Sequence, residues 1–257
     1  MPEKCLFHQC IACVQRVFSL GVIRQVLLFA FFLVLGGAAA GHAQSLVSGS
    51  ITTNTTWTAA GSPYQVTGSV TVNQGVTLTI EPGVRVEFSR YTGLFVNGNL
   101  NAVGTSAQPV NFTGTTEGSP GWWGGIFVPG SGSATLEHCT IVYAGYGILM
   151  DNTYRNAGLY KSGSGLLILK NSTLNHSFGA GLYLESGSGE VISAENTFSN
   201  NKEGARVAIN TSFQHDDTST FTGNLYDVYL HGGTVTGEVT WYLNPAYSMY
   251  LSDTVTV

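Results

Sequence analysis

The length of 257 residues allows one or two domains, and the composition already narrows the class of protein. Hydrophobic residues make up 43% and aromatic residues 11% of the chain, which is enough apolar surface to offset chain entropy and excludes a disordered protein. Because the formal net charge is −5, we expect no broad basic surface and no nucleic-acid partner. Only 10% of the residues are charged and 33 are glycine, which favours short strands joined by tight turns.

The first 43 residues follow the order of segments that is typical of a secretory signal peptide. Lys4, Arg16 and Arg24 form a basic leader, an apolar run extends from Val26 to Leu35, and small residues fill 36–43. The apolar run is too short for a hydrocarbon core of about 30 Å, which needs about 20 residues. We therefore predict a signal peptide over 1–43 and a secreted or cell-surface protein.

Two cleavage sites fit the small-residue segment, after Ala43 and, as a second choice, after Ala40. An uncleaved membrane anchor is the alternative, because the apolar run extended through Ala40 approaches spanning length. The leader also holds three cysteines whose spacing matches one iron–sulfur pattern, but they lack a fourth ligand, so we expect no cofactor. Cys139 is the one cysteine after the leader. It lies in a segment that alternates between apolar and polar residues, and we expect it to be a small core residue.

From residue 44 on, the pattern predicts strands and no helices. Short runs alternate between apolar and polar residues with a period of two, and Gly, Asn or Pro bounds each run. In chain order, the clearest runs are Val70–Val72, Leu78–Ile80, Val84–Phe88, Leu94–Val96, Val110–Phe112, Ile126–Val128 and Leu166–Leu169.

The second half of the chain repeats a threonine followed by an apolar residue. The threonines, which are 33, 24 and 23 residues apart, are Thr140, Thr173, Thr197 and Thr220. We interpret the longer first interval as a loop inserted over 151–165. The strands that follow the threonines align as 147–150, 181–184, 204–207 and 227–230. A nearly constant period of this length indicates a solenoid of stacked coils.

The architecture that fits these strands is an all-β, right-handed parallel β-helix. Equivalent strands of successive coils stack ~4.8 Å apart in parallel sheets, and inward side chains fill one long core. We predict roughly eight coils from Val72 to Val257, with the β-helix domain over 70–240 and an N-terminal cap over 44–69. Residues 241–257 resemble 57–72, so we expect them to begin a second β-helix module of a longer chain.

Four blocks in the first half resemble a known family. They are Val72–Phe88, with the tight turn Glu81-Pro-Gly83, and then Leu94–Thr105, Pro109–Thr113 and Trp123–Ile126. In this order they resemble the opening coils of secreted bacterial proteins of the pectin-lyase-like β-helix superfamily. The resemblance covers residues 45–135 and implies the same fold, but these blocks contain no catalytic residue.

The alignment of the repeated strands places five candidate ligand-binding residues on one outer face. Tyr183, Arg206 and Tyr229 form an outward column with ~4.8 Å between coils, and Glu185 and His231 lie beside it. Aromatic rings stack on sugar rings, and a guanidinium can bind a carboxylate with two parallel hydrogen bonds. The column is therefore our candidate site for an extended polysaccharide, which could be acidic. Tyrosine is also a good strand former, so a column without a ligand is the alternative.

A carbohydrate-active enzyme of the same fold is the alternative function. The resemblance implies that such lyases and hydrolases use calcium-bound carboxylates with a basic residue, or two or three carboxylates for acid–base work. The adjacent acids Asp216 and Asp217, beside His215, lie in a polar stretch where we expect a solvated turn. We assign no catalytic and no metal-binding residue.

We therefore predict a non-catalytic exported module with a role in adhesion or glycan contact. Its expected partner is an extracellular polysaccharide or a cell-surface component. Contact with a membrane is expected only through an uncleaved signal peptide.

Overall fold

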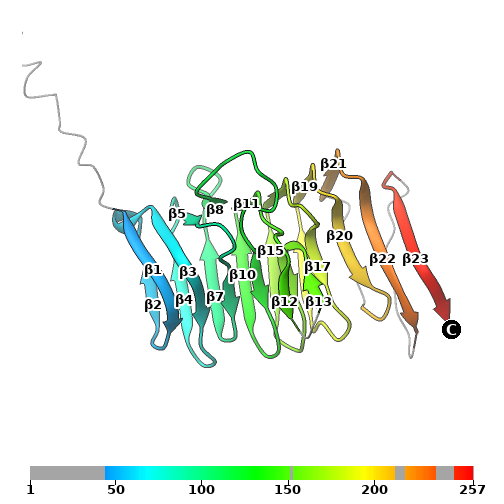
Figure 1. Cartoon of the computed structure of the whole chain (residues 1–257), viewed down its shortest axis with the longest axis horizontal. Coiled ribbons are helices and arrows are strands. Elements are labelled where there is room, and N and C mark those ends of the chain that lie inside the picture. The colour runs from blue at the N-terminus through cyan, green and yellow to red at the C-terminus, as the bar shows by residue number, and fades with distance from the viewer. Residues whose placement is uncertain (1–43, 151–152, 212–217, 236–245, 257) are drawn as a thin grey trace, which may run out of the picture. The chain divides into compact units, whose positions relative to one another are not determined.

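The computed structural model describes residues 44–150, 153–211, 218–235 and 246–256 (Figure 1). A 15-stranded sheet and a six-stranded sheet contain parallel strands that stack as about eight turns of a solenoid. The described residues hold one short 3₁₀ helix, η1 (Ala59–Gly61), and no helix among them is long and apolar enough to cross a membrane. The predicted parallel β-helix is confirmed.

Each coil contributes strands to three faces. The first face consists of β5 (Arg85–Phe88), β8 (Val110–Gly114), β11 (Cys139–Val142), β16 (Thr173–Asn175), β19 (Thr197–Ser199) and β21 (Thr220–Thr222). The second face consists of β6 (Leu94–Val96), β9 (Ile126–Val128), β14 (Ala157–Lys161), β17 (Ala180–Leu184), β20 (Glu203–Ala208), β22 (Tyr226–Thr234) and β23 (Met249–Thr256). The third face consists of β2 (Thr55–Trp57), β4 (Thr77–Ile80), β7 (Asn99–Val103), β10 (Ser133–Glu137), β15 (Leu167–Lys170) and β18 (Val191–Ala194).

Two long strands join the first and second faces into one sheet. β3 (Tyr64–Val72) pairs with β5 through its first half and with β6 through its second half. β1 (Ser45–Ile51) pairs with β3 along both halves. The corner between these two faces is therefore a bend in a continuous sheet at the start of the solenoid and a turn between separate strands in later coils.

The alternation with period two fills the core, because every second side chain of a strand points inward. On the first face, Ile141, Leu174, Phe198 and Phe221 occupy equivalent positions in successive coils. The rings of Phe198 and Phe221 stack with their centroids 4.8 Å apart. One apolar core extends in this way from the first described coils to β22.

The register of the repeated threonines is as the sequence predicts. Thr140 pairs with Thr173, Thr173 with Thr197, and Thr197 with Thr220. The alignment of the following strands is wrong in one coil, however. β12 (Ile148–Met150) pairs with β13 (Thr153–Arg155) as an antiparallel hairpin, and β14 takes the expected place of 147–150 on the second face.

The reason for this correction lies in a repeated tetrapeptide. The sequence Ala-Gly-Leu-Tyr occurs at 157–160 and again at 180–183, and the structure pairs Leu159 with Leu182 and Tyr160 with Tyr183. The inserted segment is thus the stretch that contains the hairpin, while the second part of 151–165, which we expected to be a loop, forms a core strand. Inward rows contain Leu159 and Lys161 in this coil.

The segments predicted as an N-terminal cap and as a second module form strands of the same solenoid where they are described. β1 and β2 pair in parallel with β3 and β4, and the rings of Trp57 and Tyr64 stack 4.9 Å apart. β23 pairs in parallel with β22. The domain boundaries at 44–69 and 241–257 stay predictions. The predicted signal peptide over 1–43 lies outside the described residues.

Candidate functional site

A row of large side chains follows the outer side of the second face. We call it the outer row, and its members in coil order are Phe95, Phe127, Tyr160, Tyr183, Arg206, Tyr229 and Tyr250. The three residues that we expected in one column, Tyr183, Arg206 and Tyr229, do occupy equivalent positions on adjacent strands. Their role in ligand binding stays a prediction.

Part of the outer row is buried although it lies outside the solenoid core. The exposed fractions of Phe127, Tyr160 and Tyr183 are 0%, 3% and 7%. With Ala157 and Ala180 they form a second apolar cluster. The hairpin of β12 and β13 contacts this cluster, because Arg155 Nε, at the end of β13, lies 3.3 Å from the Tyr160 hydroxyl. The inserted hairpin thus helps to turn a surface row into a small second core.

The guanidinium of Arg206 lies between two tyrosine rings. Its Cζ atom is 5.2 Å from the ring centroid of Tyr183 and 4.8 Å from that of Tyr229, within the range of cation–π attraction. Arg206 Nη1 pairs with a carboxylate oxygen of Glu203 at 3.4 Å. Arg206 Nε is buried and has no hydrogen-bond partner in the described part of the chain. The described residues therefore do not satisfy every hydrogen-bond donor of this guanidinium. A buried donor left without a partner costs about 1–3 kcal/mol.

Glu203 is almost completely buried beside this guanidinium, with 3% of its side chain exposed. Burial raises the pKa of Glu203, and the nearby charges of Arg206 and Lys202 oppose the shift. The sequence analysis did not identify Glu203, because a period of two places residues 203 and 206 on opposite faces of the strand, whereas the structure pairs their side chains.

Glu185 and His231, the other two candidates, lie together at the opposite end of the same strands. Arg155 Nε forms an ion pair with a carboxylate oxygen of Glu185 at 3.0 Å, and the other carboxylate oxygen lies 3.8 Å from His231 Nε2. The hydroxyl of Tyr160 is 3.4 Å from Glu185, and the hydroxyl of Tyr183 is 3.4 Å from His231. Burial, followed by the charge of Glu185, raises the pKa of Tyr183 to about 12. Tyr183 is therefore a neutral phenol at physiological pH.

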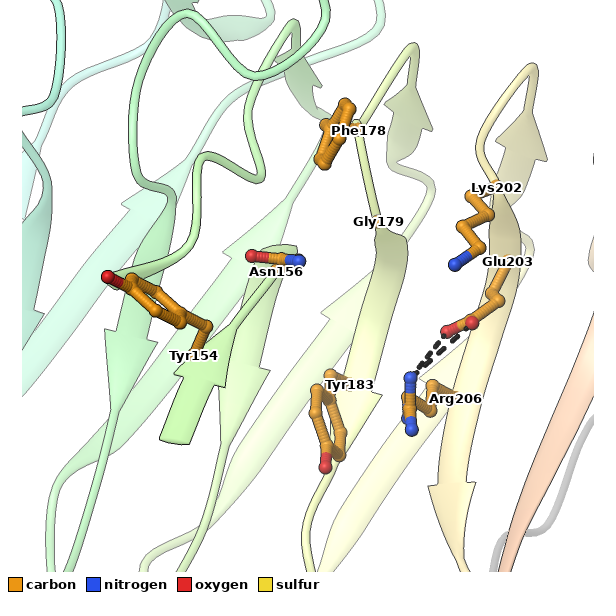
Figure 2. Close-up of a pocket in the computed structure, with 8 residues that line it drawn as sticks. All are labelled: Tyr154, Asn156, Phe178, Gly179, Tyr183, Lys202, Glu203 and Arg206. Carbon is orange, nitrogen blue, oxygen red and sulfur yellow. Dashed lines mark hydrogen bonds and ion pairs between the residues drawn. The ribbon is translucent and has the colours of Figure 1, made fainter. Parts of the chain in front are cut away.

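A pocket of about 450 Å³ opens between the hairpin and the second face (Figure 2). Tyr154 and Asn156 border it on the hairpin side, and Tyr183 and Arg206 border it on the strands. Phe178, Gly179, Lys202 and Glu203 complete the lining. Two of the five predicted residues, Tyr183 and Arg206, therefore line a concave site, while Tyr229 adjoins Arg206 outside the lining.

The ionised groups around the pocket are mostly neutralised by each other. Each of the carboxylates Glu185 and Glu203 forms an ion pair with an arginine, Arg155 and Arg206 respectively. The described residues contain no group of three or more His, Cys, Asp or Glu that could hold a metal ion. Asp216, Asp217 and His215 lie outside the described residues.

Comparisons with known proteins agree with the fold. Residues 49–152 match the family model described as a pectate-lyase like beta helix domain. A segment of 49 residues is 47% identical to the Drosophila melanogaster protein named "Protein bark beetle", and it covers 19% of this chain and 2% of that protein. The chain therefore spans only a small part of that relative's length. No solved structure matches the chain significantly.

The matched segment ends within the hairpin, so it contains the first coils but not Tyr183, Arg206 or the other candidate residues. The comparison thus supports the fold of the first coils and does not extend to the residues that line the pocket. Over 49–152, less than half of its length, the chain is therefore similar to pectate-lyase like beta helix domains, and its stacked parallel coils agree with that fold.

Proposed function

We propose that this chain is a non-catalytic β-helix module, exported from the cell, that contacts an extracellular glycan through the pocket beside the hairpin. The observation that carries the proposal is the Arg206 guanidinium, which lies between Tyr183 and Tyr229 in the pocket wall with its Nε donor unused. Ligand sites typically combine aromatic walls with a few polar groups that fix orientation, and this pocket has that composition.

The alternative is a polysaccharide lyase or glycoside hydrolase of the same fold. Glu185 and Glu203, each paired with an arginine, are then the candidate acid–base carboxylates near the pocket. The enzyme alternative makes a distinct prediction, namely depolymerisation of a glycan that stops when Glu185 or Glu203 is replaced by glutamine.

Binding is tested on a glycan array with the purified chain and with Arg206→Met and Tyr229→Ala variants. We expect each substitution to weaken binding about tenfold or more, equivalent to about 1.4 kcal/mol. Arg85→Met is the matched control, because Arg85 is a half-exposed arginine on the first face, paired with Glu87 and Glu117. Equal binding by wild type, Arg206→Met and Tyr229→Ala would contradict the proposed site.

Export is tested by expressing the full chain in a secreting host and sequencing the N-terminus of the extracellular product. We expect the mature chain to begin at Gln44, or at Gly41 if the second cleavage site is used. Retention of the whole chain inside the cell would contradict the export part of the proposal.

A further inference from the structure

A second cluster of exposed aromatic residues lies at the corner between the first and second faces. The turns of several coils cross this corner and are linked by backbone hydrogen bonds. Tyr91 N donates to Trp122 O at 3.1 Å, and Trp122 N donates to Tyr143 O at 3.0 Å. The corner therefore presents side chains of successive coils in one line along the stack.

The rings at the start of this line are accessible to solvent. Tyr91 is 48% exposed and Tyr146 is 42% exposed, and their ring centroids are 4.3 Å apart. Trp122 packs against the core on one side, and its indole Nε1 donates to Thr115 Oγ1 at 3.1 Å. The indole is thus held in a fixed orientation beside the two tyrosines.

Arg90 completes this cluster and differs from the other arginines of the solenoid. Its Cζ atom lies 4.6 Å from the ring centroid of Tyr91 and 5.5 Å from that of Trp122. Arg85, Arg155 and Arg206 each pair with a carboxylate, whereas Arg90 has no ion pair or hydrogen bond to any side chain that the structure describes. Its guanidinium is exposed and its N–H donors remain available to a ligand.

The backbone at Tyr91 is in the left-handed region, with a φ angle of 67°, which costs a residue with a Cβ atom about 1–3 kcal/mol. Left-handed φ angles recur at this corner in later coils, at Tyr143 (60°), His176 (53°), Asn200 (54°) and Gly223 (68°). The ring of Tyr91 remains half exposed, so burial of this ring in the core does not offset the strain.

We propose that Arg90, Tyr91, Trp122 and Tyr146, the corner cluster, form a second contact site for a neutral, extended saccharide that runs along the stack of coils. The flat rings offer apolar faces to the C–H faces of sugar rings, and the Arg90 donors match sugar hydroxyl groups. The cluster contains a single cation in a chain of net charge −5, which disfavours a polyanion. The inference shares the glycan class of the proposed function but none of the pocket residues.

The experiment uses the full chain and three probes, namely neutral oligosaccharides, oligogalacturonates and phosphatidylcholine vesicles. We expect neutral oligosaccharides to bind with little dependence on salt, and Tyr91→Gly and Arg90→Met each to weaken binding tenfold or more. Glycine suits the left-handed turn, so Tyr91→Gly removes the ring without unfolding the chain. Tyr91→Phe keeps the ring and should retain binding within twofold, and Arg85→Met is the control for loss of a guanidinium.

Fluorescence separates this site from the pocket. Trp57 and Trp123 are buried, no described tryptophan lines the pocket, and Trp241 lies outside the described residues. In a Trp241→Phe background, binding at the corner should shift the emission of Trp122, and Trp122→Phe should abolish the shift. Arg206→Met is expected to weaken binding at the pocket, while the emission shift of Trp122 on binding at the corner should persist. Unchanged binding in Tyr91→Gly, binding of oligogalacturonates alone, or binding of vesicles without any saccharide would each overturn the inference. Loss of neutral binding in Arg206→Met alone would overturn it while supporting the pocket.

Discussion

Lys161 occupies an inward position that neighbouring coils fill with Val128 and Leu184. Its side chain is 0% exposed, and its ammonium donates to the carbonyl oxygens of Ser162 at 2.6 Å and Gly163 at 2.7 Å. Desolvation lowers the pKa of Lys161 from 10.5 to about 8. The coil therefore accommodates a lysine at a core position because its ammonium group reaches the carbonyl oxygens of the following turn. Burial of the charged form lowers the free energy of unfolding by an amount that depends on pH.

Replacement of Lys161 by methionine should change how stability depends on pH. Between pH 8 and 10.5 the unfolded chain keeps a proton that native Lys161 has lost, so the wild-type free energy of unfolding gains up to about 1.4 kcal/mol per pH unit from this group. Below pH 8 the penalty of the buried charge is fully present. Lys161→Met lacks this term, so its stability advantage at pH 7 should shrink by about 2–3 kcal/mol by pH 10.

Urea unfolding of both proteins at pH 7, 8, 9 and 10 measures this difference. Other groups such as Tyr183 titrate in both proteins and cancel in the comparison. Parallel pH profiles of the two proteins would show that Lys161 is not desolvated in the native state.

Cys139 offers a probe of the core at the residue scale. Its thiol lies 3.2 Å from the carbonyl oxygen of Ala102, and burial raises its pKa to about 12. Since the thiolate is the reactive form, the native chain should not react with Ellman's reagent at pH 8, whereas the urea-unfolded chain should react fully. Replacement of Cys5, Cys10 and Cys13 by serine leaves Cys139 as the single thiol, so that the labelling reports on Cys139 alone. Native labelling within tenfold of the unfolded rate would be inconsistent with this burial.

At the scale of elements, the hairpin of β12 and β13 determines how deeply the middle of the outer row is buried. It lies outside the parallel sheets, and Arg155 joins it to Glu185 and to Tyr160. Both side chains of the ion pair are mostly buried, at 14% and 21% exposed. Truncation of one partner would leave the other charge poorly solvated.

Arg155→Met should therefore loosen the hairpin more than the solenoid. We expect faster hydrogen exchange in 144–156, greater exposure of Tyr160, and a loss of about 1–3 kcal/mol in the free energy of unfolding. Tyr154→Ala, which removes a 65% exposed ring from the same hairpin, is the control and should change stability by about 0.5 kcal/mol or less. Equal exchange in Arg155→Met and wild type would show that the ion pair does not hold the hairpin.

The hairpin also marks the limit of what the sequence could predict. Alternation and the interval between threonines place Tyr183, Arg206 and Tyr229 side by side, because both depend only on local periodicity. The burial of Tyr183 and the Arg155–Glu185 pair depend on an inserted segment that folds back across the sheet, and no period encodes that contact. The position of Tyr160 could have been predicted from the sequence, since the repeated Ala-Gly-Leu-Tyr places it one coil from Tyr183.

At the scale of the whole solenoid, each coil contacts mainly the coils before and after it. Strand pairs on all three faces join consecutive coils, as β5 pairs with β8 and β8 with β11. In such a stack, stability is approximately a sum of coil terms and nearest-neighbour interfaces, so damage to one coil should remain largely local. Phe88 and Trp123 provide a test, since both are 0% exposed and their rings stack 4.0 Å apart between neighbouring coils.

Phe88→Ala should lower the free energy of unfolding by about 3–5 kcal/mol, because it leaves a cavity beneath Trp123. Phe178→Ala removes a ring that is 60% exposed and should cost about 0.5 kcal/mol or less. The two variants differ further in where protection is lost. In Phe88→Ala, hydrogen exchange should accelerate in β5, β8 and β9 while β17 and β20 keep most of their protection, since those strands lie coils away. Uniform loss of protection from β4 to β22 would instead mean that the described coils open as one cooperative unit, and the nearest-neighbour description would fail for this solenoid.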